Sequence, residues 1–140
     1  MKLNPDCIRA VLLEIENSWE LRLDDSGNIR KESMNLVALN NALPDFDKRD
    51  VFYSVLNLQQ AGFLDAKIQY AANGMVYYCS INHMTYAGHQ FLDRIRDTKN
   101  WSKIKAGLDH VRNYSLDAIT ALAEGVANAA IAAFLKEQGL

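Results

Sequence analysis

YAANGMVYY, residues 70–78, decides the fold, because it places Asn73-Gly74 between two runs of apolar and aromatic residues. Asn-Gly between such runs is the strongest short-range signal for a β-hairpin, since both residues tolerate the backbone conformation of a tight turn. A two-residue turn at this point pairs Ala72 with Met75. Most of the surrounding chain has helical periodicity, so the fold has to accommodate one isolated hairpin.

The predicted register separates the hairpin into an apolar face and a polar face. The pairs predicted on the apolar face are Tyr70–Tyr77, Ile68–Cys79 and Ala66–Ile81. The pairs predicted on the polar face are Gln69–Tyr78, Lys67–Ser80 and Asp65–Asn82. A slip of one residue would mix the two faces, because neighbouring residues of a strand point to opposite sides. The hydrophobic pattern and the turn therefore predict the same register.

Helices are predicted before the hairpin from apolar residues at spacings of three and four. In the first helix Asn4 is the cap, and Pro5 fits the first position, where a missing N–H costs nothing. Its predicted apolar face contains Ile8, Val11, Leu12, Ile15 and Trp19. A short strand is predicted near Ile29. A second helix is predicted over residues 35–43, with Leu36, Leu39 and Leu43 in register, and it ends before Pro44.

Two further helices flank the hairpin. Asp47 is predicted to cap the third helix and Gly62 to end it. Thr85 is predicted to begin a fourth helix after the hairpin. The side chains expected to face inward are Val51, Val55 and Leu58 in the third helix, and Tyr86, Leu92 and Ile95 in the fourth.

The order of helix, short strand, helix, helix, hairpin and helix is that of a winged helix-turn-helix, in which the hairpin is the wing. The predicted fold class is therefore mainly α with a small β-hairpin. We expect residues 1–97 to form the winged-helix domain. Residues 98–140 are expected to form a C-terminal helical extension that serves oligomerisation or packing.

Several segments resemble those of known proteins. AGFLDAKI (61–68) and MTYAGHQFL (84–92) are similar to segments of winged-helix regulators, in which a glycine closes the recognition helix and a Thr-x-x-Gly helix follows the wing. The segments MKLNPDCIR, LQQAGFLDA and GHQFLDRIRDTKNW resemble an uncharacterised family of bacterial and prophage proteins. This resemblance implies a prophage-like genomic setting, and it brings no established activity with it.

Duplex DNA is one predicted partner, because the third helix of a DNA-binding winged helix enters the major groove. The outward side chains predicted to contact DNA are Lys48, Arg49, Tyr53, Asn57 and Gln60. Arginine and asparagine read base edges, and tyrosine reaches phosphate. Three acidic residues, Asp45, Asp47 and Asp50, crowd the same end of the helix and oppose this interpretation.

The first expectation for function is therefore a non-enzymatic DNA-binding or regulatory module, and charge and the wing tip motivate the alternative of a protein-interaction adaptor that does not bind DNA. The chain has 15 Lys and Arg against 17 Asp and Glu, whereas a protein that holds DNA by phosphate neutralisation is usually more basic. The tip, residues 71–75, carries no Lys or Arg. Met75 and Tyr78 belong to residue types that suit protein interfaces, so they are predicted interaction residues. The alternative for Tyr78 is packing on a neighbouring helix of the same chain.

The sequence contains no recognisable motif for catalysis, for a metal or for a cofactor. His83, His89 and His110 do not have the spacing of metal ligands. The only cysteines are Cys7 and Cys79, which indicates reduced thiols in the cytoplasm, and Cys79 falls on the core side of the hairpin. Nucleophile elbows and phosphate loops are absent from the sequence. We therefore expect a cytoplasmic protein that is not an enzyme and binds no metal or cofactor.

The C-terminal segment allows three interpretations. WSKIKAGLDHVRNY (101–114) is basic and amphipathic, and Ser115 is expected to cap a further, strongly apolar helix. Small residues recur every four positions in that helix, at Ala121, Gly125, Ala129 and Ala133, and such spacing lets two helices approach closely.

The helix is expected to self-associate through these four residues into a homo-oligomer, to pack back on the winged helix, or to meet a membrane. Asp117 and Glu124 argue against a membrane-spanning helix, because a central charge costs about 2.5–3.5 kcal/mol on insertion.

Overall fold

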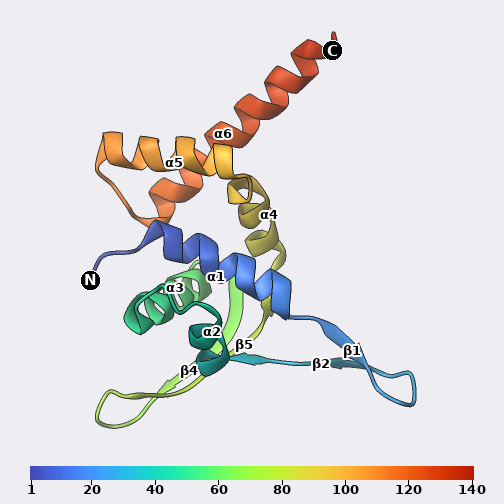
Figure 1. The fold of residues 1–140 in the computed structure, drawn as a ribbon, viewed down its shortest axis with the longest axis vertical. Coiled ribbons are helices and arrows are strands. Elements are labelled where there is room, and N and C mark those ends of the chain that lie inside the picture. The colour runs from blue at the N-terminus through green and yellow to red at the C-terminus, as the bar shows by residue number, and fades with distance from the viewer.

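Six helices and five short strands make up the computed structural model, which describes residues 1–140 (Figure 1). The helices are α1 Pro5–Ser18, α2 Leu36–Ala42, α3 Lys48–Gln60, α4 Tyr86–Ile95, α5 Thr98–Val111 and α6 Leu116–Glu137. The strands are β1 Leu21–Leu23, β2 Ile29–Lys31, β3 Met34–Asn35, β4 Leu64–Tyr70 and β5 Val76–Met84. They form a β1–β2 pair and a three-stranded antiparallel sheet in the order β3–β5–β4. The fold is thus mixed α/β, and β1 and β3 add to the hairpin and the short strand near Ile29 that the sequence predicts.

The first helix has the cap and the buried face that its sequence predicts. The Asn4 side chain accepts a hydrogen bond from the Cys7 amide at 3.2 Å, and Pro5 occupies the first helical position. Four of the five predicted apolar residues, Ile8, Val11, Leu12 and Ile15, are fully buried. They join side chains of α3, the sheet, α4 and α5 in one hydrophobic core.

The predicted starts of the later helices are confirmed, but one predicted core residue is wrong. Asp47, Thr85 and Ser115 cap α3, α4 and α6 through hydrogen bonds from backbone amides. Tyr86 is 79% exposed instead of facing inward. It lies six residues from Leu92, which at 100° per residue places it on another side of α4 from the buried stripe.

The central register of the β4–β5 hairpin is confirmed, whereas both of its ends differ from the prediction. The confirmed pairs are Ala66–Ile81, Lys67–Ser80, Ile68–Cys79 and Gln69–Tyr78. Tyr70 pairs with Val76 instead of Tyr77, and Asp65 pairs with His83 instead of Asn82. In each case β5 holds one extra residue, which is the definition of a β-bulge. The residues left without a partner are Tyr77 and Asn82.

The turn of this hairpin is also longer than predicted. The Ala71 amide donates to the Met75 carbonyl at 2.7 Å, so three residues, not two, lie inside the last hydrogen-bonded pair of the hairpin. Gly74 has a φ of +86°, which a glycine adopts without strain. A three-residue loop with glycine in this conformation is the next most common hairpin connection after two-residue turns.

A second hairpin, β1–β2, projects from the body beyond the end of α1 (Figure 1). The predicted strand near Ile29 is confirmed as β2, but its partner β1 was not predicted. Leu21, Leu23 and Ile29 are all exposed on this arm. Two paired strands of three residues present too few side chains to build a core of their own.

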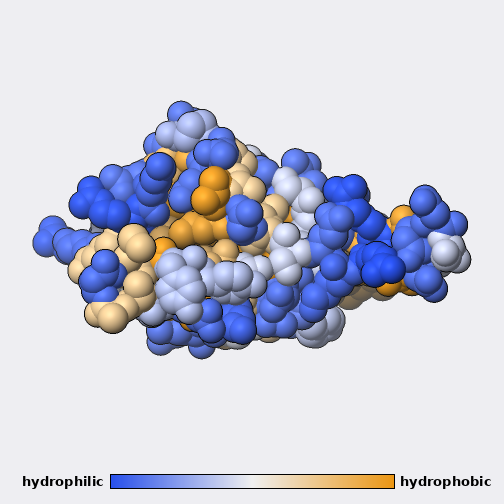
Figure 2. Space-filling view, turned by 90° about the horizontal axis from the view of Figure 1, so that it is seen from below, coloured by the Kyte–Doolittle hydropathy of each residue, from blue (hydrophilic) through white to orange (hydrophobic).

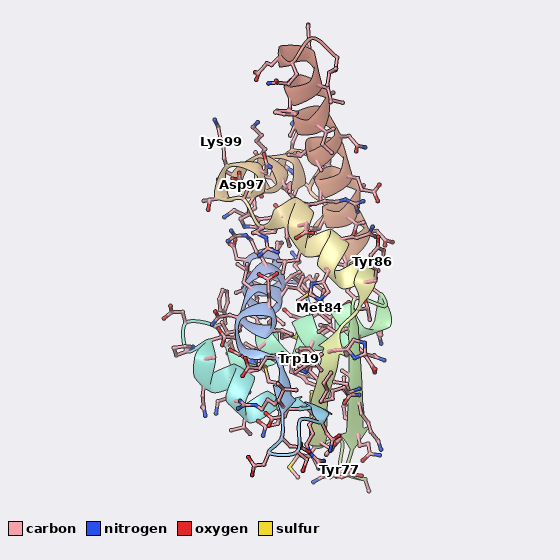
Figure 3. All side chains as sticks on the ribbon, turned by 90° about the vertical axis from the view of Figure 1, so that its right-hand side faces the viewer. Trp19, Tyr77, Met84, Tyr86, Asp97 and Lys99 are labelled. Carbon is pink, nitrogen blue, oxygen red and sulfur yellow. The ribbon has the colours of Figure 1, made fainter.

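The two C-terminal helices differ in how far they join the body. Helix α5 contributes Trp101, Ile104 and Leu108 to the common core. Asp97, the last residue of the expected N-terminal domain, is the N-cap of α5. Ile119 and Ala123 anchor the first half of α6, while its second half extends freely (Figures 1 and 3). By length and composition alone α6 could cross a membrane, and 11% of its most apolar window is buried.

Candidate interaction surfaces

The start of α3 presents two of the predicted DNA contacts. Lys48 and Arg49 are exposed there. The guanidinium of Arg49 donates to both carboxylate oxygens of Asp47, at 3.0 Å each. These hydrogen bonds, together with one from the Arg49 amide, lower the pKa of Asp47 to about 2. The charge of Arg49 is therefore already paired within the chain.

The other three predicted DNA contacts face the C-terminal helices. Tyr53 and Asn57 line a cavity of about 650 Å³ that the chain's first residues and the α5–α6 connection complete. The Asn57 side chain donates to the Tyr53 carbonyl at 2.8 Å. Gln60 borders a smaller hollow against the first residues of α6. The five predicted residues thus divide into two at the start of α3 and three beside the α5–α6 connection.

The β4–β5 hairpin carries the predicted interaction residues on open surface. Met75 is 59% exposed and Tyr78 is 45% exposed, and the ammonium group of Lys67 lies 5.9 Å from the centre of the Tyr78 ring. Tyr77, expected on the apolar inner face, is 60% exposed because of the bulge. Figure 3 shows Tyr77 at the far end of the hairpin, away from Trp19 and Met84. At Tyr77 the β4–β5 hairpin therefore exposes an aromatic side chain that the sequence pattern assigned to the core.

A groove separates β5 from the start of α2. Its volume is about 490 Å³. The residues that line it are Ser33, Asn35, Leu36 and Val37 on one side and Val76, Tyr77, Tyr78, Cys79 and Ser80 on the other. None of them carries a charge. Seen from below, hydrophobic surface gathers over the part of the molecule where α2 lies (Figure 2). We call this feature the β5–α2 groove.

Sequence reasoning missed Val37 and Tyr77 as surface residues of this groove. Val37 is 66% exposed although it belongs to a helix with a predicted core face. The sequence contained one signal for its exposure, which is that Val37 does not belong to the predicted apolar face formed by Leu36, Leu39 and Leu43. Nothing in the local pattern indicated that Tyr77 would be left unpaired.

The four small residues of α6 all lie on exposed surface. The stripe that packs on the body consists of Ile119 and Ala123, with Leu116, Leu122 and Val126 partly buried. The small residues Ala121 and Gly125 therefore face away from α4 and α5. Larger apolar side chains, Ile131, Phe134 and Leu135, are exposed nearer the C-terminus.

The surroundings of the thiols and histidines show neither a reactive thiol nor a cluster of metal ligands. Burial raises the pKa of Cys7 and of Cys79, so both thiols stay protonated at neutral pH. His83 lies 3.6 Å from a carboxylate oxygen of Asp65 across the hairpin. No group of three or more histidine, cysteine, aspartate or glutamate side chains lies close enough to hold a metal ion.

These features define a small mixed α/β protein with two exposed hairpins and a long, partly free C-terminal helix. The chain belongs to the family described as Hypothetical protein (DUF2513), which matches residues 2–114, and this confirms the expected membership of an uncharacterised family. An uncharacterised protein of Haemophilus influenzae is 31% identical over 134 residues, which cover 90% of this chain and 95% of that protein. No solved structure matches the chain.

Proposed function

We propose that the chain is a winged-helix protein that acts as a non-enzymatic adaptor and binds another protein through its wing, the β4–β5 hairpin. The order α1, β3, α2, α3, β4, β5, with β3 paired to β5, supports the winged-helix assignment. The observation that carries the adaptor function is the exposed, uncharged tip and outer surface of the wing, at Met75, Tyr77 and Tyr78. A prophage-like setting and a cytoplasmic location remain predictions.

The wing favours a protein partner over DNA for chemical reasons. Aromatic residues and methionine are enriched at protein interfaces, whereas a wing that follows a DNA backbone needs cations. Residues 71–75 supply none. At the start of α3, the charge of Arg49 is paired with Asp47, which weakens its attraction for phosphate.

Co-purification tests the adaptor function. The tagged chain, produced in cells that encode it naturally, is expected to retain a partner in fixed stoichiometry. Met75→Asp should lose that partner, because it places a charge at the centre of the apolar tip. Tyr86→Asp is the matched control, since Tyr86 is also an exposed apolar residue, 79% against 59% for Met75, but lies on α4. A chain that purifies alone, or whose partner is retained by Met75→Asp, contradicts the proposal.

Duplex DNA is the second candidate partner, and two exposed cations favour it. Lys48 lies at the start of α3 outside the Arg49–Asp47 ion pair, and Lys67 lies on the wing. Fluorescence anisotropy with a random-sequence duplex at low and then moderate salt tests this candidate. Binding that weakens with salt supports it, because released counterions produce that dependence. Absence of binding at low salt excludes direct DNA recognition.

A further inference from the structure

The central strand of the three-stranded sheet has a partner along only part of one edge. On one side, β4 accompanies β5 from Val76 to Met84. On the other side, β3 pairs only with Ser80 and Ile81, because the chain turns into α2 at Leu36. Residues 76–79 of β5 therefore have no strand beside their second edge.

The unpaired stretch forms one wall of the β5–α2 groove. Four residues of extended chain span about 13 Å. Along that length, the backbone N–H and C=O groups that do not pair with β4 lie beside the groove, where no strand receives them, and the bulge at Tyr77 interrupts their regular alternation. Leu36 and Val37 form the opposite wall. The groove thus combines a row of free backbone groups with apolar side chains on its far side.

We propose that the β5–α2 groove binds an extended peptide segment of a partner protein, which continues β3 as an added strand antiparallel to β5. This inference rests on the proposed adaptor function and assigns the chemical class of its partner. Main-chain hydrogen bonds to residues 76–79 supply the binding, and the walls select alternate side chains of the peptide. Because the groove has no charged lining residue, the bound segment is uncharged and rich in β-branched or aromatic residues.

The position of the edge explains why the occupant is a separate strand and not the same edge of a second copy. The free edge is recessed behind α2, whose residues Leu36 and Val37 line the groove opposite to it. In a symmetric dimer each edge would have to pass the other molecule's α2 before the backbones could meet. A single extended peptide has no such obstacle.

A tethered peptide tests the inference without knowledge of the natural partner. Ser33→Cys introduces a thiol at the rim of the groove, in a Cys79→Ala background because Cys79 itself lines the groove, whereas Cys7 is fully buried and does not compete for labelling. The probe is a hexapeptide of alternating threonine and valine, joined through a flexible glycine linker. Such a tether gives an effective concentration in the millimolar range, so weak docking is detectable. The matched control peptide is N-methylated at alternate amides and cannot donate toward β5.

Amide hydrogen exchange at residues 76–79 is the measurement. With the threonine–valine peptide, the amides that face the groove should exchange at least tenfold more slowly than with the N-methylated peptide. Val37→Asp should remove that difference, and Tyr86→Asp should retain it. Equal exchange with the two peptides overturns strand addition.

Two outcomes separate this inference from the adaptor function on which it rests. If exchange is equal with both peptides but Met75→Asp still loses a co-purified partner, the wing binds that partner through side chains alone and strand addition is wrong. If untethered protein shows protection at residues 76–79 that rises with its own concentration, a second copy occupies the groove. That result also overturns the assignment to a partner peptide.

Discussion

Two helical glycines differ in the space that surrounds them, and this difference acts at the scale of single residues. A Cβ built on Gly88 would lie 2.1 Å from the Phe63 carbonyl oxygen and 2.8 Å from Cγ of Met84. A Cβ on Gly125 would meet no atom within 4 Å. Gly88 therefore permits α4 to pack closely on the backbone after α3, whereas Gly125 is exposed on α6.

Alanine at these two positions should change stability in opposite directions. Gly88→Ala is expected to lower the free energy of unfolding by about 1–3 kcal/mol, because Phe63 contributes rigid backbone to the clash. Gly125→Ala should raise it by about 0.5–1 kcal/mol, since alanine favours the helix and has open space. Urea denaturation measures both values, and a tolerated Gly88→Ala would show that α4 can move away from Phe63.

Stability should also depend on pH through Glu16. Arg96 donates hydrogen bonds to the Glu16 carboxylate, so the pKa of Glu16 lies below its usual value of 4.5. A carboxylate with a lowered folded pKa stabilises the fold above its unfolded pKa, and it loses that effect as the pH falls through the folded pKa. Glu16→Gln should thus lower the free energy of unfolding by at most about 1 kcal/mol at neutral pH, because solvent screens this partly exposed ion pair.

The pH dependence distinguishes this ion pair from a packing effect. The stability difference between the native chain and Glu16→Gln should shrink as the pH falls below 4.5, because protonated glutamate and glutamine are both neutral. Glu14→Gln is the control, since Glu14 lies on the same helix without an arginine partner. A difference that stays constant with pH contradicts the ion-pair explanation.

At the scale of elements, local signals predicted helix starts and the hairpin register, but they did not predict bulges. Asn4, Asp47, Thr85 and Ser115 cap their helices because an N-cap interacts with amides only two or three residues away. A bulge shifts the strand pairing by one residue but needs no particular residue type at that position. The hydrophobic pattern around Tyr77 therefore did not indicate the bulge. Strand β1 was not predicted because both of its faces are exposed, and an exposed strand does not need the alternation of apolar and polar residues that marks a half-buried strand.

The free half of α6 is an element without a partner in the chain. Its exposed helical part, residues 128–137, is about 15 Å long, which is half the hydrocarbon thickness of a bilayer. A spanning helix would have to pull Ile119 and Ala123 out of the core. A helix that is apolar on all sides is stable where other helices cover it, and we therefore propose a homo-oligomer formed through α6.

Charge on α6 should abolish this self-association. Sedimentation velocity of the native chain is expected to show a concentration-dependent oligomer, and the double variant Ile131→Glu, Phe134→Glu should remain monomeric. Tyr86→Glu serves as the control for an added surface charge. A native chain that is monomeric at high concentration but floats with anionic liposomes would instead assign α6 to a membrane surface.

At the scale of the whole molecule, α5 connects the C-terminal helices to the N-terminus. The indole N–H of Trp101 donates to Asp6 at 2.8 Å, and the Lys105 ammonium lies 3.2 Å from the same carboxylate. Arg9 donates to the Ile95 carbonyl at 2.9 Å from the neighbouring turn of α1. These contacts join residues more than eighty positions apart, so they hold α5 and the end of α4 against α1.

Truncation of Trp101 should weaken the whole body. Trp101→Ala is expected to lower the free energy of unfolding by about 3–5 kcal/mol, because it removes a large buried ring. Trp101→Phe retains an aromatic ring but loses the donor to Asp6, and about 1–3 kcal/mol is expected for it. Chemical denaturation followed by circular dichroism should show one transition in each case. A separate early transition in Trp101→Ala would mean that α5 unfolds independently.

Long-range placement limited what the sequence could predict about the candidate sites. Helical periodicity correctly indicated that Tyr53, Asn57 and Gln60 lie away from the core face of α3. It could not indicate that the α5–α6 connection lies beside them, since that contact joins segments more than fifty residues apart. Met75 and Tyr78 were predicted as surface residues because turn chemistry and strand alternation are local.

The bulges of β5 also bear on whether the protein stays soluble when its groove is empty. An unpaired sheet edge is a template on which identical molecules can stack into fibrils. The bulges at Tyr77 and Asn82 increase the local twist of β5, and the stretch beside the groove that has no strand at its second edge is only four residues long. Twist and shortness both disfavour the flat, continuous pairing on which a growing fibril depends.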